Sequence, residues 1–542
     1  MVVGNPNKIN LSTSFFERII SDGNLYVDKT RMIENFLNDS SDVNLIARQR
    51  RMGKSLNMDM VRCFLTDKTD LRHLFMGLYI ESSSVWEKAN SSPVFSFDFR
   101  LLQPDRLEKK LYFLVCEYMH EYVKMGVELS LSARDYFENK NIDDPGGLYY
   151  LTETACRATG KRSYILIDEY DKLLMENYGD ENYAKIRDFE KAFLSAGLKG
   201  NQYLEKALIT GVMRVSKESM FSDLNNIKTF DIFKDDTYTY DYGFTEAEIL
   251  ELQQLIDFDI KTAKNWYNGI NIDGHPVYNT YSMMSFLNRK TYECYWAMSG
   301  SMNIISNLLN DSRWEDITKL MRGEQLLTPI ENRISLEKIQ DHNTGNEFFY
   351  SLLVQGGYLS LQRKINENQW MVNIPNQELF HVWKNFILQD LYKGSNSRVV
   401  SIFDNINCPH AFKEDLEEIL TDSMSYHDLF VKKGEDSKRV HERVYHIFIL
   451  GLLSGNRDMD SKRPLSNRES GNGRYDILVE RHDICVVFEL KACEKNETPE
   501  KAAQRALEQI DTRRYGLDVG KDKKLVKVGV GFKGKNCRVA VR

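Results

Sequence analysis

The sequence predicts a mixed α/β chain, with a parallel sheet first, a helical module in the middle and a smaller α/β domain last. Three observations lead to this class. Short apolar runs alternate with helical stretches over roughly the first 230 residues, as they do in parallel α/β sheets. The middle of the chain then reads as helical and aromatic-rich. The last part changes in charge and contains an apolar strand that two charged side chains interrupt.

The composition is that of a folded chain with several domains. It has 542 residues, of which 42% are hydrophobic and 28% are charged, and its net charge is −7. These values exclude collagen, disorder and a disulfide scaffold. The N-terminus lacks a basic region followed by an apolar run, and no run of about 18 apolar residues occurs, so we expect a cytoplasmic protein without a membrane partner. The eight cysteines form no C-x-x-C pair, which predicts reduced thiols and no structural zinc.

Four apolar runs predict the strands of the first sheet. They are Val43–Ala47, Val94–Phe99, Ser163–Ile167 and Ala207–Thr210, and helical patterns such as Leu107–Tyr122 fill the intervals. Strands that alternate with helices indicate parallel pairing. Ligands of such sheets bind at the carboxyl ends of the strands, so the residues that follow these runs are the candidates for a site.

The middle of the chain reads as a helical module. Thr245 is followed three residues later by Glu248, a capping-box pattern that predicts the start of a helix. We expect helices with small winged elements here, and no residue pattern points to chemistry. The predicted domains are residues 1–240, 241–430 and 431–542.

The C-terminal segment is basic, whereas the rest of the chain is acidic. Residues 463–542 contain 18 Lys and Arg against 12 Asp and Glu, a net charge of +6. A basic segment on an acidic body suggests an anionic partner. A solvated basic surface is the competing interpretation, and charge alone does not choose between the two.

A phosphate-binding loop follows the first predicted strand. The segment 48–55 reads RQRRMGKS and leads into a helical stretch, which is the strand–loop–helix order of a P-loop. Gly53 would let the backbone approach a phosphate, Lys54 would reach the β- and γ-phosphates of ATP, and the Ser55 hydroxyl would hold Mg²⁺. Arg48 stands where this motif usually has its first glycine, so the pattern is incomplete.

Two acidic residues follow the third predicted strand. Asp168 could hold the Mg²⁺ shell, and Glu169 could orient or activate an attacking water, whereas the plain alternative is an acidic loop. Thr210 ends the next strand and could sense the γ-phosphate, and Arg214 and Lys217 could reach phosphate. For these three residues, a capping threonine and surface cations explain the pattern equally well.

These motifs resemble the AAA-ATPase-like family of P-loop NTPases. The matching stretches are YVDKT at 26–30, RQRRMGKSL at 48–56, IDEYD at 167–171, the segment 210–226, WYNGI at 266–270 and YNTYS at 278–282. The resemblance covers about residues 8–390 and implies a P-loop NTPase parallel sheet that binds ATP and Mg²⁺. The matched loop also brings Arg51 and Leu56 into the nucleotide-binding set, and the basic loop of the family accounts for Arg48.

A second group of charged residues lies near the C-terminus. Twelve residues separate Asp476 from Glu489, which lies in the apolar run ICVVFELKA, and Lys491 lies two residues further on. Residues two apart in a strand share a face, so two carboxylates and a lysine converge. Asp476 and Glu489 could bind Mg²⁺, and Lys491 could position a water or the scissile phosphate. An ion pair on a strand face is the competing interpretation. Glu442, on a preceding helix, could add a third carboxylate.

This segment resembles the PD-(D/E)XK nuclease superfamily. The resemblance covers about residues 435–542 and implies a C-terminal α/β nuclease-like domain. The matching stretches are VYHIFILGLLSG at 444–455, GNGRYDILV at 471–479, FELKA at 488–492, QIDTRRY at 509–515 and VGVGF at 528–532.

The resemblance also implies roles for individual residues. Asp476, Glu489 and Lys491 form the metal and catalytic set, Leu490 joins the metal-binding group, and Glu442 is the acid of the first helix. All three core positions are intact, which predicts an active enzyme. The residues on the nucleic-acid side would be Gln509, Tyr515 and Arg474.

Together the two patterns predict an ATP-binding and ATP-hydrolysing protein coupled to a Mg²⁺-dependent nuclease, with DNA as the favoured nucleic acid. The oligomeric state stays open, although an arginine that acts in trans would require a homo-oligomer. Two other functions remain: a signalling NTPase switch whose nuclease-like domain only binds nucleic acid or a partner, and a nuclease for RNA. Defence against foreign DNA is suggested by analogy with the architecture alone.

Overall fold

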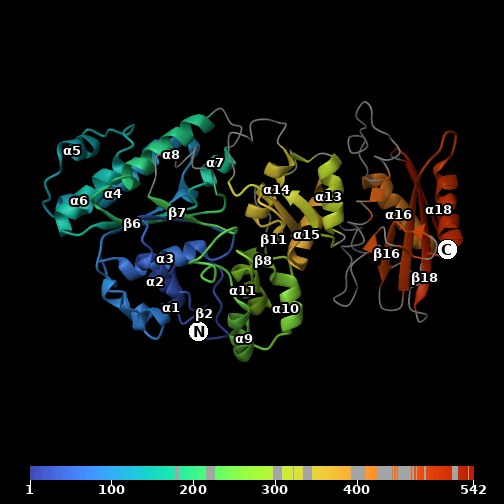
Figure 1. Cartoon of the computed structure of the whole chain (residues 1–542), viewed down its shortest axis with the longest axis horizontal. Coiled ribbons are helices and arrows are strands. Elements are labelled where there is room, and N and C mark those ends of the chain that lie inside the picture. Colours follow the sequence, from blue (N-terminus) through green and yellow to red (C-terminus); the bar gives the residue numbers. More distant parts are fainter. Residues whose placement is uncertain are drawn as a thin grey trace. The chain divides into compact units, whose positions relative to one another are not determined.

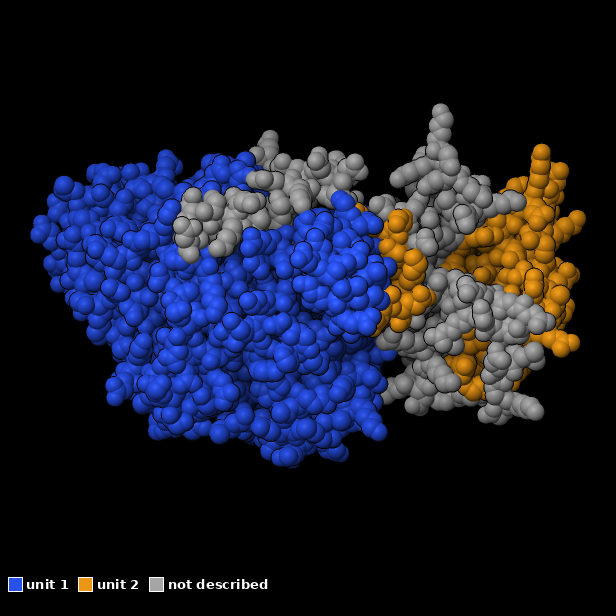
Figure 2. Space-filling model, viewed as in Figure 1, with its two compact units in different colours: residues 1–308, 326–379 blue, residues 309–325, 380–542 orange. Residues whose placement is uncertain are grey.

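The computed structural model divides into two compact units (Figure 1, Figure 2). Unit 1 contains residues 1–308 and 326–379, and unit 2 contains residues 309–325 and 380–542. The predicted boundaries at residues 240 and 430 stay a prediction. The structure describes residues 1–177, 182–214, 226–296, 305, 308–309, 311–321, 323–333, 345–391, 409–423, 442, 445–446, 449, 465–466, 469–470, 473–480, 484–515, 523–534 and 536–542.

Five parallel strands form the main sheet of unit 1, in the order β4-β5-β6-β3-β7. They are β3 (Val43–Ala47), β4 (Val94–Asp98), β5 (Ser163–Asp168), β6 (Leu204–Gly211) and β7 (Ile227–Phe230). Strands β3 and β5 are buried along their whole length, which is why they read as unbroken apolar runs. The four predicted strands are therefore confirmed. Strand β7 escapes prediction because only its first and last residues are buried.

Helices cover both faces of this sheet, with α4, α6 and α8 on one side and α2 and α3 on the other (Figure 1). The predicted helix over 107–122 is confirmed as α4. In the described part of the chain, no helix has the length and apolar character that crossing a bilayer requires. The α-helices described in the first 200 residues are α1 (Phe16–Ser21), α2 (Arg31–Asn38), α3 (Lys54–Leu65), α4 (Leu107–Lys124), α5 (Leu131–Glu138), α6 (Gly147–Thr159), α7 (Lys172–Glu176) and α8 (Tyr183–Leu198).

The helical part of unit 1 begins with the predicted capping box. The Thr245 hydroxyl accepts a hydrogen bond from the backbone N–H of Glu248, and the Glu248 carboxylate accepts one from the backbone N–H of Thr245, so α9 (Glu246–Leu255) starts as expected. The apolar core of this part also takes in Leu25 and Val27. The N-terminal and middle segments of the sequence therefore share a hydrophobic core.

Small antiparallel elements interrupt these helices. Strands β8 and β9 form a hairpin, and a separate sheet has the order β10-β12-β11. Helix α15 starts in unit 1 and continues into the residues of unit 2. The elements are α10 (Ile260–Tyr267), β8 (Ile270–Ile272), β9 (His275–Val277), α11 (Thr280–Arg289), β10 (Leu326–Pro329), α14 (Asn346–Gly356), β11 (Ser360–Lys364), β12 (Gln369–Asn373) and α15 (Gln377–Leu391).

A mixed sheet with the order β13-β16-β17-β18-β19 forms the centre of unit 2. Strand β17 pairs antiparallel with β16 and parallel with β18. Most of the predicted stretch 444–455 lies outside the described residues. The elements of unit 2 are α13 (Asp311–Met321), α16 (Pro409–Ser423), β13 (Leu465–Ser466), β14 (Glu469–Ser470), β15 (Gly473–Arg474), β16 (Ile477–Glu480), β17 (Ile484–Ala492), α18 (Pro499–Arg513), β18 (Lys524–Lys533) and β19 (Asn536–Val541).

Two glycines of β18 allow α18 to lie directly on the sheet. A Cβ atom at Gly529 would lie 2.2 Å from the carbonyl oxygen of Ala503, and one at Gly531 would lie 2.1 Å from that of Pro499. Both distances are far inside van der Waals contact, so a side chain would push the helix away. Helix α18 also packs against β17, and the glycines thus set the height of this helix above that strand.

Candidate functional site

The predicted phosphate-binding loop lies between β3 and α3. Gly53 has a φ of +88°, a left-handed conformation that favours glycine, and Lys54 directly after it starts α3. The Lys54 side chain is buried, and its ammonium donates hydrogen bonds to the carbonyl oxygens of Arg48 and Gln49 over 3.0 Å each. Burial lowers the pKa of Lys54, and the negative charge of Glu169 opposes that shift.

Side chains from three neighbouring segments meet at Asp168. Ser55 Oγ donates to Asp168 Oδ2 over 2.5 Å, and Thr210 Oγ1 donates to Asp168 Oδ1. The carboxylate of Glu169 lies 3.9 Å from the ammonium of Lys54. The structure therefore gathers five predicted residues at the carboxyl ends of parallel strands, where sheets of this kind bind ligands.

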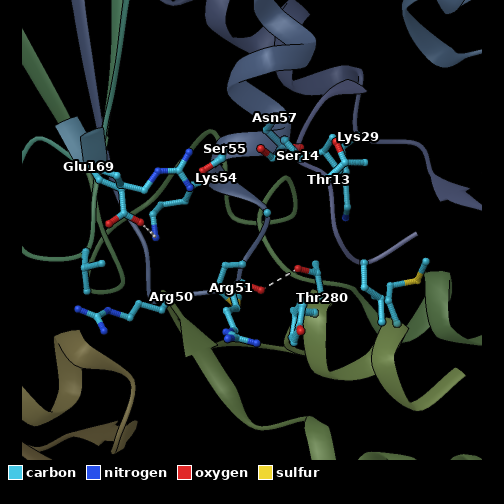
Figure 3. Close-up of a pocket in the computed structure, with 18 of the residues that line it drawn as sticks. Thr13, Ser14, Lys29, Arg50, Arg51, Lys54, Ser55, Asn57, Glu169 and Thr280 are labelled. Atoms are coloured by element: carbon cyan, nitrogen blue, oxygen red, sulfur yellow. Dashed lines mark hydrogen bonds and ion pairs between the residues drawn. The ribbon is translucent and has the colours of Figure 1, made fainter. Parts of the chain in front are cut away.

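A cavity of about 960 Å³ lies over this loop. In Figure 3, Lys54 and Glu169 lie on one side of the cavity, and Thr13, Ser14 and Lys29 lie on the other. Cations and loop N–H groups beside apolar walls suit a ligand with an anionic and an apolar part. The predicted residues in its lining are Arg51, Gly53, Lys54, Ser55, Leu56 and Glu169, and the apolar lining includes Leu11, Ile19, Leu25, Val27, Phe244 and Met284.

Two arginines of the predicted motifs are engaged in ion pairs. Arg48 is buried and pairs with Asp235, so this departure from the usual glycine contributes a contact between the loop and the segment after β7. The guanidinium of Arg214 pairs with Asp231, and Arg214 is absent from the cavity lining. Lys217 lies outside the described residues.

The start of helix α11 holds the phosphate-binding loop from the other side. Thr280 Oγ1 donates to the carbonyl oxygen of Arg51 over 2.8 Å (Figure 3). Asn279 Nδ2 donates to that of Arg50 over 3.2 Å. The guanidinium carbon of Arg51 lies 4.0 Å from the ring centroid of Tyr281, a cation–π contact. The loop conformation therefore depends on residues more than 200 positions away in the sequence.

A buried carboxylate continues this network. Arg51 Nη1 donates to the carbonyl oxygen of Tyr295 over 3.0 Å. The backbone N–H groups of Tyr295 and Trp296 donate to Glu378 Oε1 over 2.7 and 2.8 Å. Burial raises the pKa of Glu378 to about 7. Glu378 lies in the first turn of α15, so the network connects the loop to that helix.

Sequence reasoning missed two charged residues of the nucleotide site. Arg100 follows the end of β4, lines the cavity, and its Nη2 lies 3.5 Å from Asp168 Oδ2. Asp171 accepts hydrogen bonds from the backbone N–H groups of Val212 and Met213, and burial together with the charge of Glu169 raises its pKa to about 6. The rule that ligands bind at strand ends would have pointed to Arg100, because β4 neighbours β5.

The predicted carboxylate–lysine group assembles in unit 2. Asp476 precedes β16, and its Oδ2 accepts a hydrogen bond from the backbone N–H of Leu490 over 2.7 Å. Glu489 and Lys491 share a face of β17, as their spacing predicts, and Lys491 Nζ lies 2.9 Å from Glu489 Oε1. Gln509 of α18 donates to the same oxygen over 2.5 Å.

The second oxygen of Glu489 is the least satisfied atom of this group. Glu489 is 2% exposed, and its buried Oε2 has no hydrogen-bond partner among the residues that the structure describes. Burial and the charge of Asp476 raise the pKa of Glu489, whereas Lys491 opposes the shift. A divalent cation between Asp476 and Glu489 would remove this repulsion, and carboxylate oxygens suit Mg²⁺. The described residues contain no group of three or more His, Cys, Asp or Glu side chains arranged to hold a metal.

The other predicted residues of unit 2 lie around this group. Glu442 Oε1 accepts a hydrogen bond from the backbone N–H of Ala492 over 3.2 Å. Gln509 also donates to the Tyr515 hydroxyl over 3.3 Å, so the pair meets beside Glu489. Arg474 is in β15, where its backbone pairs with that of Glu469.

Two family models match separate parts of the chain. Residues 10–221 match the model of a predicted AAA-ATPase family, and residues 440–541 match that of the PD-(D/E)XK nuclease superfamily. An uncharacterised protein from the vnfD 5′ region of Azotobacter chroococcum mcd 1 is 26% identical over 365 residues, which cover 65% of this chain and 64% of that protein. The solved structure of a Walker-type ATPase from Pyrococcus abyssi aligns with a TM-score of 0.34 and 15% sequence identity. The alignment covers 66% of this chain and 94% of the Pyrococcus abyssi chain. The chain therefore combines an AAA-ATPase-like domain with a C-terminal domain of the PD-(D/E)XK nuclease superfamily.

Proposed function

We propose that this chain binds and hydrolyses ATP and couples that reaction to Mg²⁺-dependent cleavage of phosphodiester bonds in DNA. The observation that carries the proposal is the environment of Glu489. Its Oε1 accepts hydrogen bonds from Lys491 and Gln509, while its buried Oε2 has no hydrogen-bond partner in the described part of the chain. Such an oxygen is unfavourable unless a cation or a proton satisfies it, and a metal shared with Asp476 would do so.

The nuclease residues would have distinct tasks. Asp476 and Glu489 would hold Mg²⁺, which when bound lowers the pKa of an attacking water and stabilises negative charge on the scissile phosphate. Lys491 is 22% exposed, so its ammonium can also meet solvent or a phosphate while it pairs with Glu489. Gln509 would keep the Glu489 carboxylate in one orientation, because its amide donates to Oε1.

The NTPase residues would bind and orient MgATP. Lys54 would neutralise the β- and γ-phosphates, and the backbone N–H groups at the start of α3 would bind phosphate oxygens. Ser55 and Asp168, which are already hydrogen-bonded to each other, would hold the magnesium ion of the nucleotide. Glu169 would orient or activate the attacking water.

Coupling is supported by the contacts of the phosphate-binding loop. Arg51 lines the cavity and is hydrogen-bonded to Tyr295, whose backbone N–H binds Glu378. Glu378 belongs to α15, the helix that continues from unit 1 into the residues of unit 2. Nucleotide that draws Arg51 toward its phosphates would therefore change the contacts at the start of this helix.

The test is a cleavage assay on linear, circular and single-stranded DNA with Mg²⁺, with and without ATP. We expect Asp476→Ala and Lys491→Ala to abolish cleavage and to keep ATP turnover, because they lie in the C-terminal domain. Lys54→Ala should abolish ATP binding and remove the response of cleavage to ATP. Lys495→Ala, a change of an exposed lysine four residues after Lys491, is the matched control and should cleave normally.

Other outcomes would redirect the proposal. ATP turnover without cleavage and without metal binding would support a switch whose nuclease-like domain only binds nucleic acid or a partner. Cleavage of matched RNA but not of DNA would change the substrate. Defence against foreign DNA extends the proposal. It requires that phage form plaques as efficiently on cells with the Lys491→Ala variant as on cells without the protein.

A further inference from the structure

Arg100 bridges two acids at the carboxyl ends of neighbouring strands. Asp98 of β4 and Asp168 of β5 are register partners in the parallel sheet. The Arg100 Nε lies 2.9 Å from Asp98 Oδ1, and Nη2 lies 2.7 Å from Asp98 Oδ2. The same Nη2 lies 3.5 Å from Asp168 Oδ2. Asp98 therefore anchors the guanidinium, and Asp168 attracts it more loosely.

The Asp168 oxygen that Arg100 approaches is also bound by Ser55. Ser55 Oγ lies 2.5 Å from Asp168 Oδ2, so the hydroxyl and the guanidinium converge on one carboxylate oxygen. In the proposed function, Ser55 and Asp168 hold the magnesium ion of the nucleotide. Arg100 thus places a positive charge beside the position that a bound cation would occupy, and the two charges would compete for Asp168.

The guanidinium of Arg100 is able to turn toward a ligand. Its side chain is 39% exposed and lines the same cavity as Lys54 and Ser55. Within the described part of the chain, Nη1 of Arg100 makes no hydrogen bond, although an arginine has five donors to offer. The interaction of Arg100 with Asp98 keeps it charged, since it raises the pKa of the guanidinium.

We propose that Arg100 is a phosphate-binding residue. When a nucleoside triphosphate and its metal bind, the Arg100 guanidinium moves from Asp168 to the terminal phosphate. The inference rests on the proposed function, because it assumes a nucleotide in this cavity. It assigns the recognition of the third phosphate to a residue of the same chain, in the segment that follows β4. Arginine suits this task, because its planar donors match phosphate oxygens.

The test compares ATP and ADP affinities of the full chain with Mg²⁺, by calorimetry, for wild type, Arg100→Ala and Arg100→Lys. A contact with the terminal phosphate predicts that Arg100→Ala reduces the preference for ATP over ADP by about tenfold. Arg100→Lys should restore part of that preference, since a point charge remains. Arg157→Ala removes a comparable arginine–glutamate pair on α6, away from the cavity, and should leave the preference unchanged.

Each outcome separates this inference from the proposed function. Equal weakening of ATP and ADP binding, or an unchanged preference in Arg100→Ala, would overturn the role of Arg100 while leaving the nucleotide site intact. A wild-type chain that binds neither nucleotide would instead overturn the proposed function. Thermal unfolding of each variant shows whether the ion pair with Asp98 matters only for folding: a large loss of stability with an unchanged ATP preference would assign Arg100 to the fold.

Discussion

Thr280 donates a hydrogen bond from its hydroxyl to the carbonyl oxygen of Arg51 over 2.8 Å, although 229 positions separate the two residues. This contact ties the start of α11 to the loop that lines the nucleotide cavity. Thr280 itself lines the cavity, and its hydroxyl helps to set the conformation of the loop.

We expect Thr280→Val to weaken ATP binding by about three- to tenfold, the loss of roughly one hydrogen bond of about 1 kcal/mol. The valine keeps the size of the side chain and removes only the donor. Titration with a fluorescent ATP analogue measures the effect. Thr154→Val removes a hydroxyl-to-carbonyl bond inside α6, away from the cavity, and should bind as wild type does. Equal affinities for Thr280→Val and wild type would contradict the prediction.

The pH dependence of stability should report the protonation of Glu378. Its pKa in the folded chain is raised to about 7, so between about pH 4.5 and 7 the folded state binds a proton that the unfolded state releases. The free energy of unfolding should therefore fall as pH rises through this window, by on the order of 3 kcal/mol at most.

Glu378→Gln isolates this contribution, because the amide oxygen can still accept the two backbone hydrogen bonds. Its unfolding temperature, relative to wild type, should rise from pH 5 to pH 8. Differential scanning calorimetry at several pH values makes the comparison. Glu138→Gln, at the exposed end of α5, serves as the control and should show no such trend. A constant offset between wild type and Glu378→Gln at all pH values would refute the assignment.

Gln509 should affect metal binding without being a ligand. Its amide donates to Glu489 Oε1 and to the Tyr515 hydroxyl, so Gln509→Leu leaves the carboxylate less well oriented. We expect Mg²⁺ affinity to fall by about 10- to 100-fold, as measured by Mg²⁺ titration of the cleavage rate. Gln504→Leu, on the exposed face of the same helix, provides a control of identical chemistry. If both variants need the same Mg²⁺ concentration as wild type, the orienting role is wrong.

Gly531→Ala should destabilise the C-terminal domain. The new methyl group would lie 2.1 Å from the Pro499 carbonyl oxygen and 2.3 Å from the Ala503 nitrogen, which are backbone atoms that cannot rotate away. Overpacking of this kind costs about 1–3 kcal/mol. The midpoint of urea unfolding, followed by far-UV circular dichroism, measures this loss of stability. Gly345→Ala adds a methyl group to open space in unit 1 and should leave the transition nearly unchanged, so similar losses in both variants would argue against a packing cause.

The strands and the phosphate-binding loop were predictable because their signals are local. The run VNLIA coincides with β3 at both ends, since a strand buried on both faces is apolar throughout. The spacing of Glu489 and Lys491 placed both on one face of β17, and the structure confirms that they meet. In these cases a few consecutive residues carry all the information.

The remaining contacts depend on tertiary packing and leave no local pattern. Nothing near Arg100 in the sequence indicates Asp168, because the two meet only when β4 pairs with β5. Glu378 accepts hydrogen bonds from the backbone N–H groups of Tyr295 and Trp296. It lies more than 80 positions further along the chain. In the sequence, Arg48 makes the loop motif incomplete. In the structure, Arg48 forms a buried ion pair with Asp235, which explains why an arginine stands at this position.

The parallel pairing of β17 with β18 also has a consequence during synthesis of the chain. Strand β17, with nine residues of the sequence ICVVFELKA, leaves the ribosome beside its hairpin partner β16, while β18 follows only after α18. Until β18 has emerged, β17 presents an apolar edge with unpaired backbone groups, the kind of edge on which chains aggregate. Messages truncated before residue 524 should therefore yield insoluble or rapidly degraded products, so that an incomplete C-terminal domain does not accumulate.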